Sequence, residues 1–388
     1  MSAAEIIALV ISGALLLYVL SGGADFGGGI WDLAARGPRA AAQRRLVERA
    51  IAPVWEANHV WLIVAVVLLF SAFPPAFAAL ANRLHVPLTA LLLGIVLRGS
   101  ALVFRQYGGP EAAHRWQRVF AISSAATPFF LGAVLGAVTS GAASEADRLA
   151  WLAPLPLAAG AAAAISCAYL AAVYLTVEAE AQAEKAGPGP AGERDRGSVV
   201  SIRPTEPAVR RGADEVGGVP RRHRPAERGS AKPRLGARGG STDASSELVR
   251  DFRRRAVAAH VALAASVAAC AAAAHASAPG FADRLFGSPW SAPLLAGAAL
   301  AAGAAFAALF GRRFRLARAF AVLETSALCA AWGAAHAPAL IAPDLTVANA
   351  AAPAETLEIL VPVIAIGAVV IAPALLLLLR VFKASPPP

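Results

Sequence analysis

The chain has 388 residues, of which 57% are hydrophobic and 15% are charged, and its formal net charge at pH 7 is +10. A soluble domain usually contains about 45–50% apolar residues, so this composition excludes an ordinary soluble globular protein and indicates that lipid surrounds most of the chain. The positive charge does not indicate nucleic-acid binding, because the arginines lie between apolar runs and in one polar tract.

The apolar runs are long enough to cross a membrane as helices. A span needs about 20 apolar residues, and only helices or closed barrels satisfy their backbone groups in lipid. Because the runs are continuous, we predict an all-α integral membrane protein with about nine transmembrane helices. Their expected ranges are 5–28, 50–73, 77–104, 117–140, 149–178, 254–275, 289–311, 317–337 and 356–382.

The basic connections predict the orientation of these helices. Arginines gather in the first, third and seventh connections, at Arg36, Arg39, Arg44, Arg45, Arg49, Arg105, Arg115, Arg118, Arg312, Arg313, Arg315 and Arg318. Lysine and arginine are enriched on the cytoplasmic side, so we expect the N-terminus outside and the C-terminus in the cytoplasm. The first span lacks the basic start and cleavage site of a signal peptide, and we expect it to be retained.

A polar tract divides the chain into three parts. Residues 185–250 are rich in Arg, Gly, Pro, Glu and Ser, and we expect them to form a disordered, basic cytoplasmic insertion. This insertion separates N-terminal transmembrane helices 1–5, in residues 1–184, from helices 6–9, in residues 251–388. Its arginines suit anionic lipid or a partner, but a solvated linker is the simpler interpretation.

The first span ends in a glycine-rich run that contains Asp25. Ionisable residues at membrane depth are costly and are usually functional. The glycines let another helix approach while the carboxylate points inward. A phosphate-binding loop is not indicated, because no strand precedes the run and no lysine follows at the required spacing.

The second span opens with the run Trp55-Glu56-Ala57-Asn58-His59-Val60-Trp61. Glu56 and His59 are three residues apart and share a helix face, with Asn58 adjacent. A carboxylate and an imidazole together can transfer protons near neutral pH. Glu-x-x-His also binds iron in di-iron bundles, but no other span carries a second copy, so we expect no metal site. A buried polar network that only fixes helix packing is the alternative.

Other polar residues in the spans have simpler interpretations. We expect His85, His260, His275 and His336 to be packed or interfacial residues rather than haem ligands. Arg98, Glu178 and Glu324 are expected near span ends, with side chains that extend to the membrane surface.

The two long motifs resemble hallmark segments of cytochrome bd-type quinol oxidase subunit II, with weaker similarity at residues 97–100, 168–170 and 343–350. The resemblance implies two four-helix bundles plus one peripheral helix, paired with a related subunit I that ligates haem b and haem d. It implies a subunit of a quinol:oxygen oxidoreductase of the bacterial inner membrane. Such a subunit stabilises subunit I, contributes a proton or oxygen pathway and holds no haem itself.

On this resemblance, Glu56 and Asp25 correspond to acids proposed for proton transfer, and His59 lies beside them. The resemblance places Trp61 near a proposed oxygen route. Trp55, Asn58 and Trp61 are therefore candidates for residues at an interface or along an oxygen route.

The chain departs from the family pattern in two places. Many members carry a second acid at the position of Gly22, and the tract near 187–250 exceeds the usual short connection. A membrane transporter or channel that uses Glu56, His59 and Asp25 is the alternative function. It predicts an inverted repeat with broken helices, and neither motif recurs in the second half.

Overall fold

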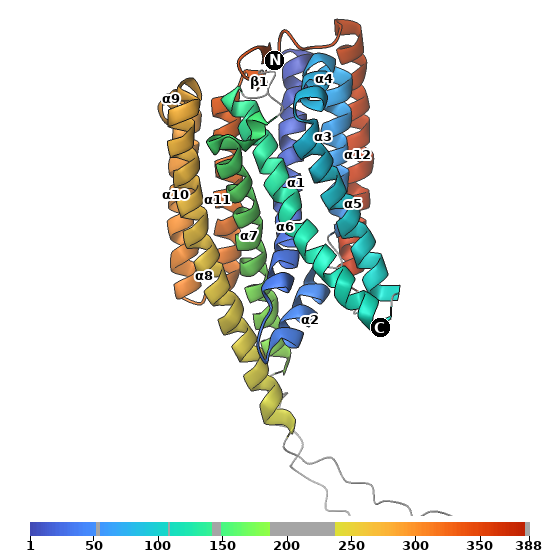
Figure 1. The fold of residues 1–388 in the computed structure, drawn as a ribbon, viewed down its shortest axis with the longest axis vertical. Helices are drawn as coiled ribbons and strands as arrows, with labels where there is room; N and C mark the ends of the chain where they lie inside the picture. Colours follow the sequence, from blue (N-terminus) through green and yellow to red (C-terminus); the bar gives the residue numbers. More distant parts are fainter. Residues whose placement is uncertain (52–54, 108, 142–148, 187–236, 385–388) are drawn as a thin grey trace, which may run out of the picture.

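The computed structural model describes residues 1–51, 55–107, 109–141, 149–186 and 237–384 (Figure 1). Twelve α-helices run through these residues: α1 (Ala3–Ala34), α2 (Ala40–Ile51), α3 (Trp55–Ala72), α4 (Pro74–Arg83), α5 (His85–Tyr107), α6 (Pro110–Ser140), α7 (Pro154–Ala186), α8 (Ala237–Ser277), α9 (Pro279–Gly287), α10 (Ser291–Phe310), α11 (Phe314–His336) and α12 (Ala354–Ala384). A short antiparallel hairpin, β1 (Ala339–Ile341) and β2 (Leu345–Thr346), joins α11 to α12.

The helices form two four-helix bundles and one peripheral helix. The first bundle contains α1, α3, α5 and α6, and the second contains α7, α8, α10 and α11. Helix α12 lies at the edge of the first bundle, against α1 and α3 (Figure 1). The all-α membrane fold expected from the sequence and the resemblance is therefore confirmed.

The number of spans differs from the nine expected. Seven of the described helices are long and apolar enough to cross a membrane, or up to eight if the bent pair α3 and α4 counts as one span. Helix α11 has a similar length but is not among them, because it carries Arg315 and Arg318 as well as Glu324 and His336. The third expected span begins at His85 rather than at residue 77, because the chain bends by 114° between α3 and α4, where Pro74 opens α4.

Two helices extend into the range expected for the insertion. Helix α7 ends at Ala186 and α8 begins at Ala237, inside the range 185–250 that we assigned to the insertion. Residues 187–236 lie outside the described residues.

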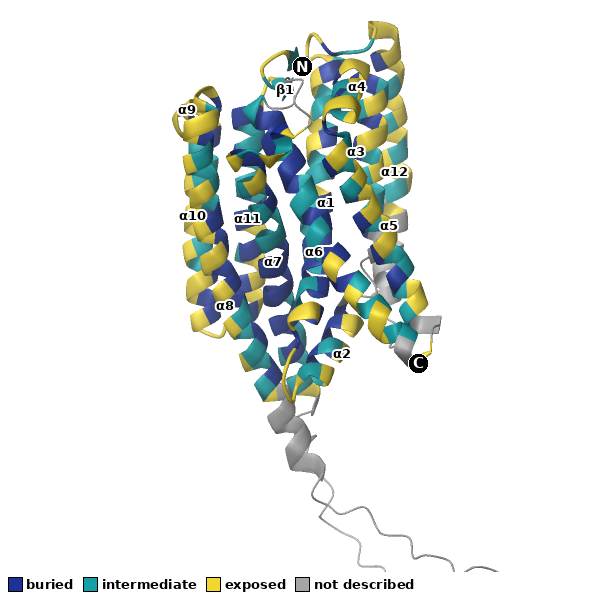
Figure 2. Cartoon of the chain, in the orientation of Figure 1, coloured by how far each residue is buried: buried dark blue, intermediate teal, exposed yellow. Residues whose placement is uncertain are grey.

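Exposed residues are frequent on the outer helices α10 and α12, whereas buried residues gather on α1, α6 and α7 inside the molecule (Figure 2). Large exposed hydrophobic side chains on α3, α5, α10 and α12 suit contact with lipid. One buried apolar cluster fills the end of the first bundle near the N-terminus; it includes Ile7, Ile11, Leu68, Phe73 and Val134.

Helix α1 joins the two bundles by close backbone contact. A side chain at Gly27 would collide with the backbone carbonyl of Cys167 on α7, and one at Gly29 would collide with the Ser124 side chain on α6. Nearby, Trp31 Nε1 donates a hydrogen bond to the Ala168 carbonyl oxygen at 2.7 Å. The small residues therefore let α7 approach α1 closely, as in other membrane helix pairs.

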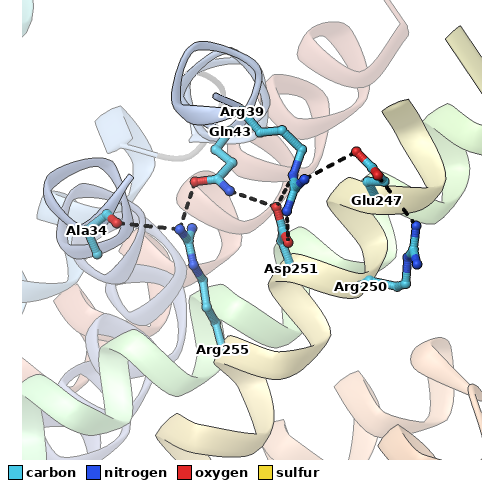
Figure 3. A network of polar contacts seen from close by, with 7 residues as sticks. All are labelled: Ala34, Arg39, Gln43, Glu247, Arg250, Asp251 and Arg255. Atoms are coloured by element: carbon cyan, nitrogen blue, oxygen red, sulfur yellow. Dashed lines mark hydrogen bonds and ion pairs between the residues drawn. The ribbon is translucent and has the colours of Figure 1, made fainter. Parts of the chain in front are cut away.

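A polar network links α2 to α8 at the opposite end from the N-terminus (Figure 3). Arg39 binds the Asp251 carboxylate through Nε and Nη2, each at 2.8 Å, and contacts Glu247 at 3.3 Å. Gln43 donates to Asp251 at 2.8 Å and accepts from Arg255 at 2.7 Å. The network thus joins α2, which follows α1 of the first bundle, to α8 of the second bundle.

We predict that Gly27→Ala lowers the thermal stability of the protein. The added methyl group meets a backbone carbonyl that cannot rotate away, and such overpacking costs about 1–3 kcal/mol. The measurement is the midpoint of thermal unfolding of the purified protein in detergent. Gly13→Ala on the same helix is the matched control, since nothing lies within 4 Å of a Cβ atom there. Equal midpoints for the two variants would show that the contact between α1 and α7 is not tight.

Candidate functional site

Asp25 forms a buried ion pair with Arg98 inside the first bundle. The carboxylate lies on α1 and is fully buried, and Arg98 reaches it from α5 with 3% of its side chain exposed. Arg98 Nη2 donates to Asp25 Oδ1 and also to the Asp25 backbone carbonyl oxygen, 3.3 Å away. Each charge therefore neutralises the other in a region where lipid solvates neither.

Three further contacts hold Arg98 in this position. Its Nε donates to Ser124 Oγ at 3.0 Å. Its Cζ lies 4.9 Å from the ring centroid of Phe26 and 5.0 Å from that of Phe120. Our expectation that Arg98 extends to the membrane surface was wrong, because Asp25 supplies a counter-ion inside the bundle.

The start of α3 packs against α1 through Asn58. Its side chain is fully buried, and its Oδ1 accepts a hydrogen bond from Ser21 Oγ at 2.8 Å. A Cβ atom at Gly22 would lie 2.7 Å from Asn58 Nδ2, so the missing side chain makes room for the amide. The next residue, His59, has its ring centroid 6.4 Å from that of Tyr18 on α1. Polar groups therefore line the contact between the two helices.

Four buried polar atoms at this contact have no hydrogen-bond partner within the described part of the chain: Asp25 Oδ2, Tyr18 Oη, Asn58 Nδ2 and His59 Nδ1. Tyr18 and His59 are both close enough to Asp25 to interact with its charge. Unpartnered polar atoms are costly in an apolar environment, and buried water commonly satisfies them. The arrangement is typical of a site that takes up water or protons.

A second carboxylate, Asp32, lies two helical turns after Asp25 on α1. Gln117 Nε2 donates to Asp32 Oδ2 at 3.1 Å, and Arg105 Nη1 lies 3.8 Å from the same oxygen. Arg105 also pairs with Glu48 on α2 at 3.0 Å, and the Glu48 side chain is 60% exposed whereas that of Asp32 is 2% exposed. These contacts connect the buried end of α1 to the protein surface.

One aromatic ring contacts both arginines that pair with these carboxylates. The Cζ atoms of Arg98 and Arg105 lie 5.0 and 5.6 Å from the centroid of the Phe120 ring. Sequence reasoning did not single out Asp32 as a site residue, although its seven-residue spacing from Asp25 puts both acids near one helix face. The spacing could therefore have identified Asp32 as a second buried acid from the sequence alone.

The structure brings four of the six predicted site residues together between α1 and α3. Asp25, Asn58 and His59 make the contacts above, and Trp61 is half-buried against a core that includes Tyr18. The described parts of the two sequence motifs are therefore neighbours in space.

The other two predicted site residues lie at the start of α3. The side chains of Trp55 and Glu56 lie outside the described residues, although α3 begins at Trp55 and the Glu56 backbone therefore belongs to its first turn. Within the described ranges, no group of three or more His, Cys, Asp and Glu residues is arranged to hold a metal ion.

Two packed bundles of apolar helices that enclose an ion pair and further carboxylates define a polytopic integral membrane protein with an ionisable site inside the membrane. The family model for cytochrome bd terminal oxidase subunit II matches residues 3–187 and 240–382, which include both bundles. The chain belongs to the cytochrome bd terminal oxidase subunit II family.

Similar proteins agree with this assignment. The cytochrome bd ubiquinol oxidase subunit 2 of Bacillus subtilis (strain 168) is 32% identical over 106 residues, which are 27% of this chain and 31% of that protein. The cytochrome bd-I ubiquinol oxidase subunit 2 of Escherichia coli (strain K12) is 27% identical over 141 residues, 36% of this chain and 37% of that protein. The chain thus matches about a third of the length of these relatives.

The fold is also similar to a solved structure. A chain from the structure of bd oxidase from Geobacillus thermodenitrificans superposes with a TM-score of 0.67 and 20% sequence identity, and the comparison covers 100% of both chains. At this identity the likeness concerns the fold, and it agrees with the two-bundle arrangement.

We predict that Arg98→Met destabilises the protein strongly and that adding Asp25→Asn restores much of the loss. The single change leaves a buried carboxylate without a counter-ion, and breaking a buried pair in this way costs about 3–5 kcal/mol. The measurement is again the midpoint of thermal unfolding. Arg118→Met, at an exposed position on α6, is the control. A double variant as unstable as Arg98→Met would show that the unpaired charge is not the cause.

Proposed function

We propose that this chain is subunit II of a terminal oxidase that oxidises quinol and reduces oxygen to water, and that it works as a heterodimer with a haem-bearing subunit I. The observation that carries the proposal is the family match over both bundles. The role of this chain is to stabilise subunit I and to supply a path for protons or oxygen.

The haems, of b and d type in this proposal, belong to the partner subunit and carry electrons from quinol to oxygen when bound. Three of the histidine rings in the described membrane helices pack against other aromatic rings: His59 on Tyr18, His260 on Tyr169 and His336 on Trp332. The chain also has a single methionine, Met1, so it offers no His/Met ligand pair inside the membrane. Both observations support the proposal that the partner subunit holds the haems.

The proposed orientation places the N-terminus outside a bacterial inner membrane and the C-terminus in the cytoplasm. Helix α2 and the connections from α5 to α6 and from α10 to α11 all lie at the end opposite the N-terminus (Figure 1). They carry the arginine groups found in the sequence, which favours the cytoplasm for that end. The basic insertion in 185–250 belongs on the same side in this proposal.

Within the oxidase, Glu56, His59 and Asp25 are the proposed proton-transfer residues. Asp25 Oδ1 accepts a hydrogen bond from Arg98, whereas Asp25 Oδ2 and His59 Nδ1 have no partner among the described residues. Trp55, Asn58 and Trp61 are proposed to shape the contact with subunit I or the oxygen route. The unpartnered atoms support this division of roles.

Removing this chain from the complex tests the oxidase proposal. Membranes that express subunit I alone should lose the visible absorbance of assembled haem and quinol-dependent oxygen consumption, because the haem-bearing subunit then lacks its support. Expression of both subunits from the same vector is the control. A stable and fully active oxidase without this chain would refute the proposal.

A separate experiment tests the proton role. Glu56→Gln keeps the shape of the side chain but cannot release a proton, so turnover and proton uptake should fall by about 10- to 100-fold while haem content stays normal. Asp283→Asn, at an exposed position on α9, is the control and should leave both rates unchanged. Normal proton uptake in a fully assembled Glu56→Gln complex would exclude Glu56 as a carrier.

A further inference from the structure

The second bundle contains a buried cluster of ionisable side chains of its own. Glu324 lies on α11, His260 on α8 and Tyr169 on α7, so three helices contribute one group each. The side chains of His260 and Glu324 are 8% and 6% exposed, and Tyr169 is fully buried. We expected Glu324 near a span end with its side chain at the membrane surface, and the structure shows that this was wrong.

The three groups face one another at short range. His260 Nδ1 lies 4.0 Å from Glu324 Oε2, and the Tyr169 ring meets the His260 ring edge-on with centroids 4.8 Å apart. Phe306 on α10 covers the imidazole from another side at 5.7 Å. The cluster is therefore closed by apolar and aromatic surface.

Each of the three side chains has a buried polar atom without a partner in the described part of the chain: Tyr169 Oη, His260 Nδ1 and Glu324 Oε2. Among the described residues, the salt bridges leave Glu324 with no arginine or lysine counter-ion. Arg253, two turns from His260 on α8, donates instead to the Leu309 carbonyl oxygen at 2.9 Å. Among the described side chains, the His260 imidazole alone is placed to balance a charge on Glu324.

Proton binding lowers the free-energy cost of burying Glu324 and His260 together. A lone carboxylate or imidazolium at membrane depth is expensive, but a pair that holds one proton is neutral, whether the proton is on Glu324 or on His260. A small side-chain rotation from 4.0 Å closes the hydrogen bond between them, and the Tyr169 hydroxyl can donate to the carboxylate.

We infer that Glu324, His260 and Tyr169 form a second proton-binding site of this chain, in which the carboxyl and imidazole groups together bind and release a proton. The site is separate from Asp25, which lies in the first bundle, and it does not depend on the proposed function. Tyr169 is a positioning residue that orients the carboxyl group.

Infrared difference spectroscopy of the purified complex, titrated with acid, tests the inference. The wild-type protein should show a protonated-carboxyl band that appears as the pH falls and shifts in heavy water. Glu324→Gln should lose this band. Glu178→Gln, on α7 nearer the basic end, is the matched control and should keep it. A titration identical in Glu324→Gln and wild type would overturn the inference and leave the cluster a purely structural contact.

His260→Gln provides a second measurement that does not require Glu324→Gln to fold. The carboxyl band should remain in this variant, but its midpoint should shift by about one pH unit or more, as expected for two groups that share a proton. An unchanged midpoint in a folded His260→Gln complex would overturn the inference as well. A purely structural hydrogen bond would lower the stability of both variants without a titrating band.

Discussion

Lipid offers no hydrogen bonds, so every charge inside this protein must find its partner on another helix. The ion pair between Asp25 and Arg98 meets that requirement in the first bundle, and it also decides which helices are neighbours, since it joins α1 to α5 and, through Ser124, to α6. The burial of these charges is tolerable only while all three helices stay together. Two further polar contacts of α1 lie on either side of this pair in the sequence: Ser21 donates to Asn58 on α3, and Asp32 accepts from Gln117 on α6.

Helix α1 has two roles that make opposite demands on its sequence. Its glycines remove side chains so that α6 and α7 can approach, whereas its acids need space and partners inside the bundle. The helix satisfies both because the small residues and the carboxylates alternate along it. At the basic end, the network of Arg39, Gln43 and Asp251 adds a second tie between the bundles, which depends on charge rather than on close packing.

The fold followed from the sequence because apolar runs in lipid have few alternatives to helices. The motifs around Asp25 and Asn58 were both visible in the sequence, and the structure places their helices, α1 and α3, side by side. Arg98 and Glu324 were misjudged, since a sequence gives the depth of a residue only roughly and does not show which helix faces it. The bend between α3 and α4 was missed for a related reason: Phe73-Pro74-Pro75 marked a break, but its angle depends on the packing of Phe73 in the core.

The two ends of the first bundle differ in polarity, because the apolar cluster fills the end near the N-terminus. From the arginine-rich end, polar groups follow one another from the exposed Glu48 to Asp32 and then, across the Phe120 ring, to Asp25. Beyond the level of Tyr18, the interior is filled by side chains such as Ile7, Ile11 and Phe73. Within the described residues, the buried polar contacts of the first bundle therefore extend toward the arginine-rich end and are closed by apolar packing toward the N-terminus.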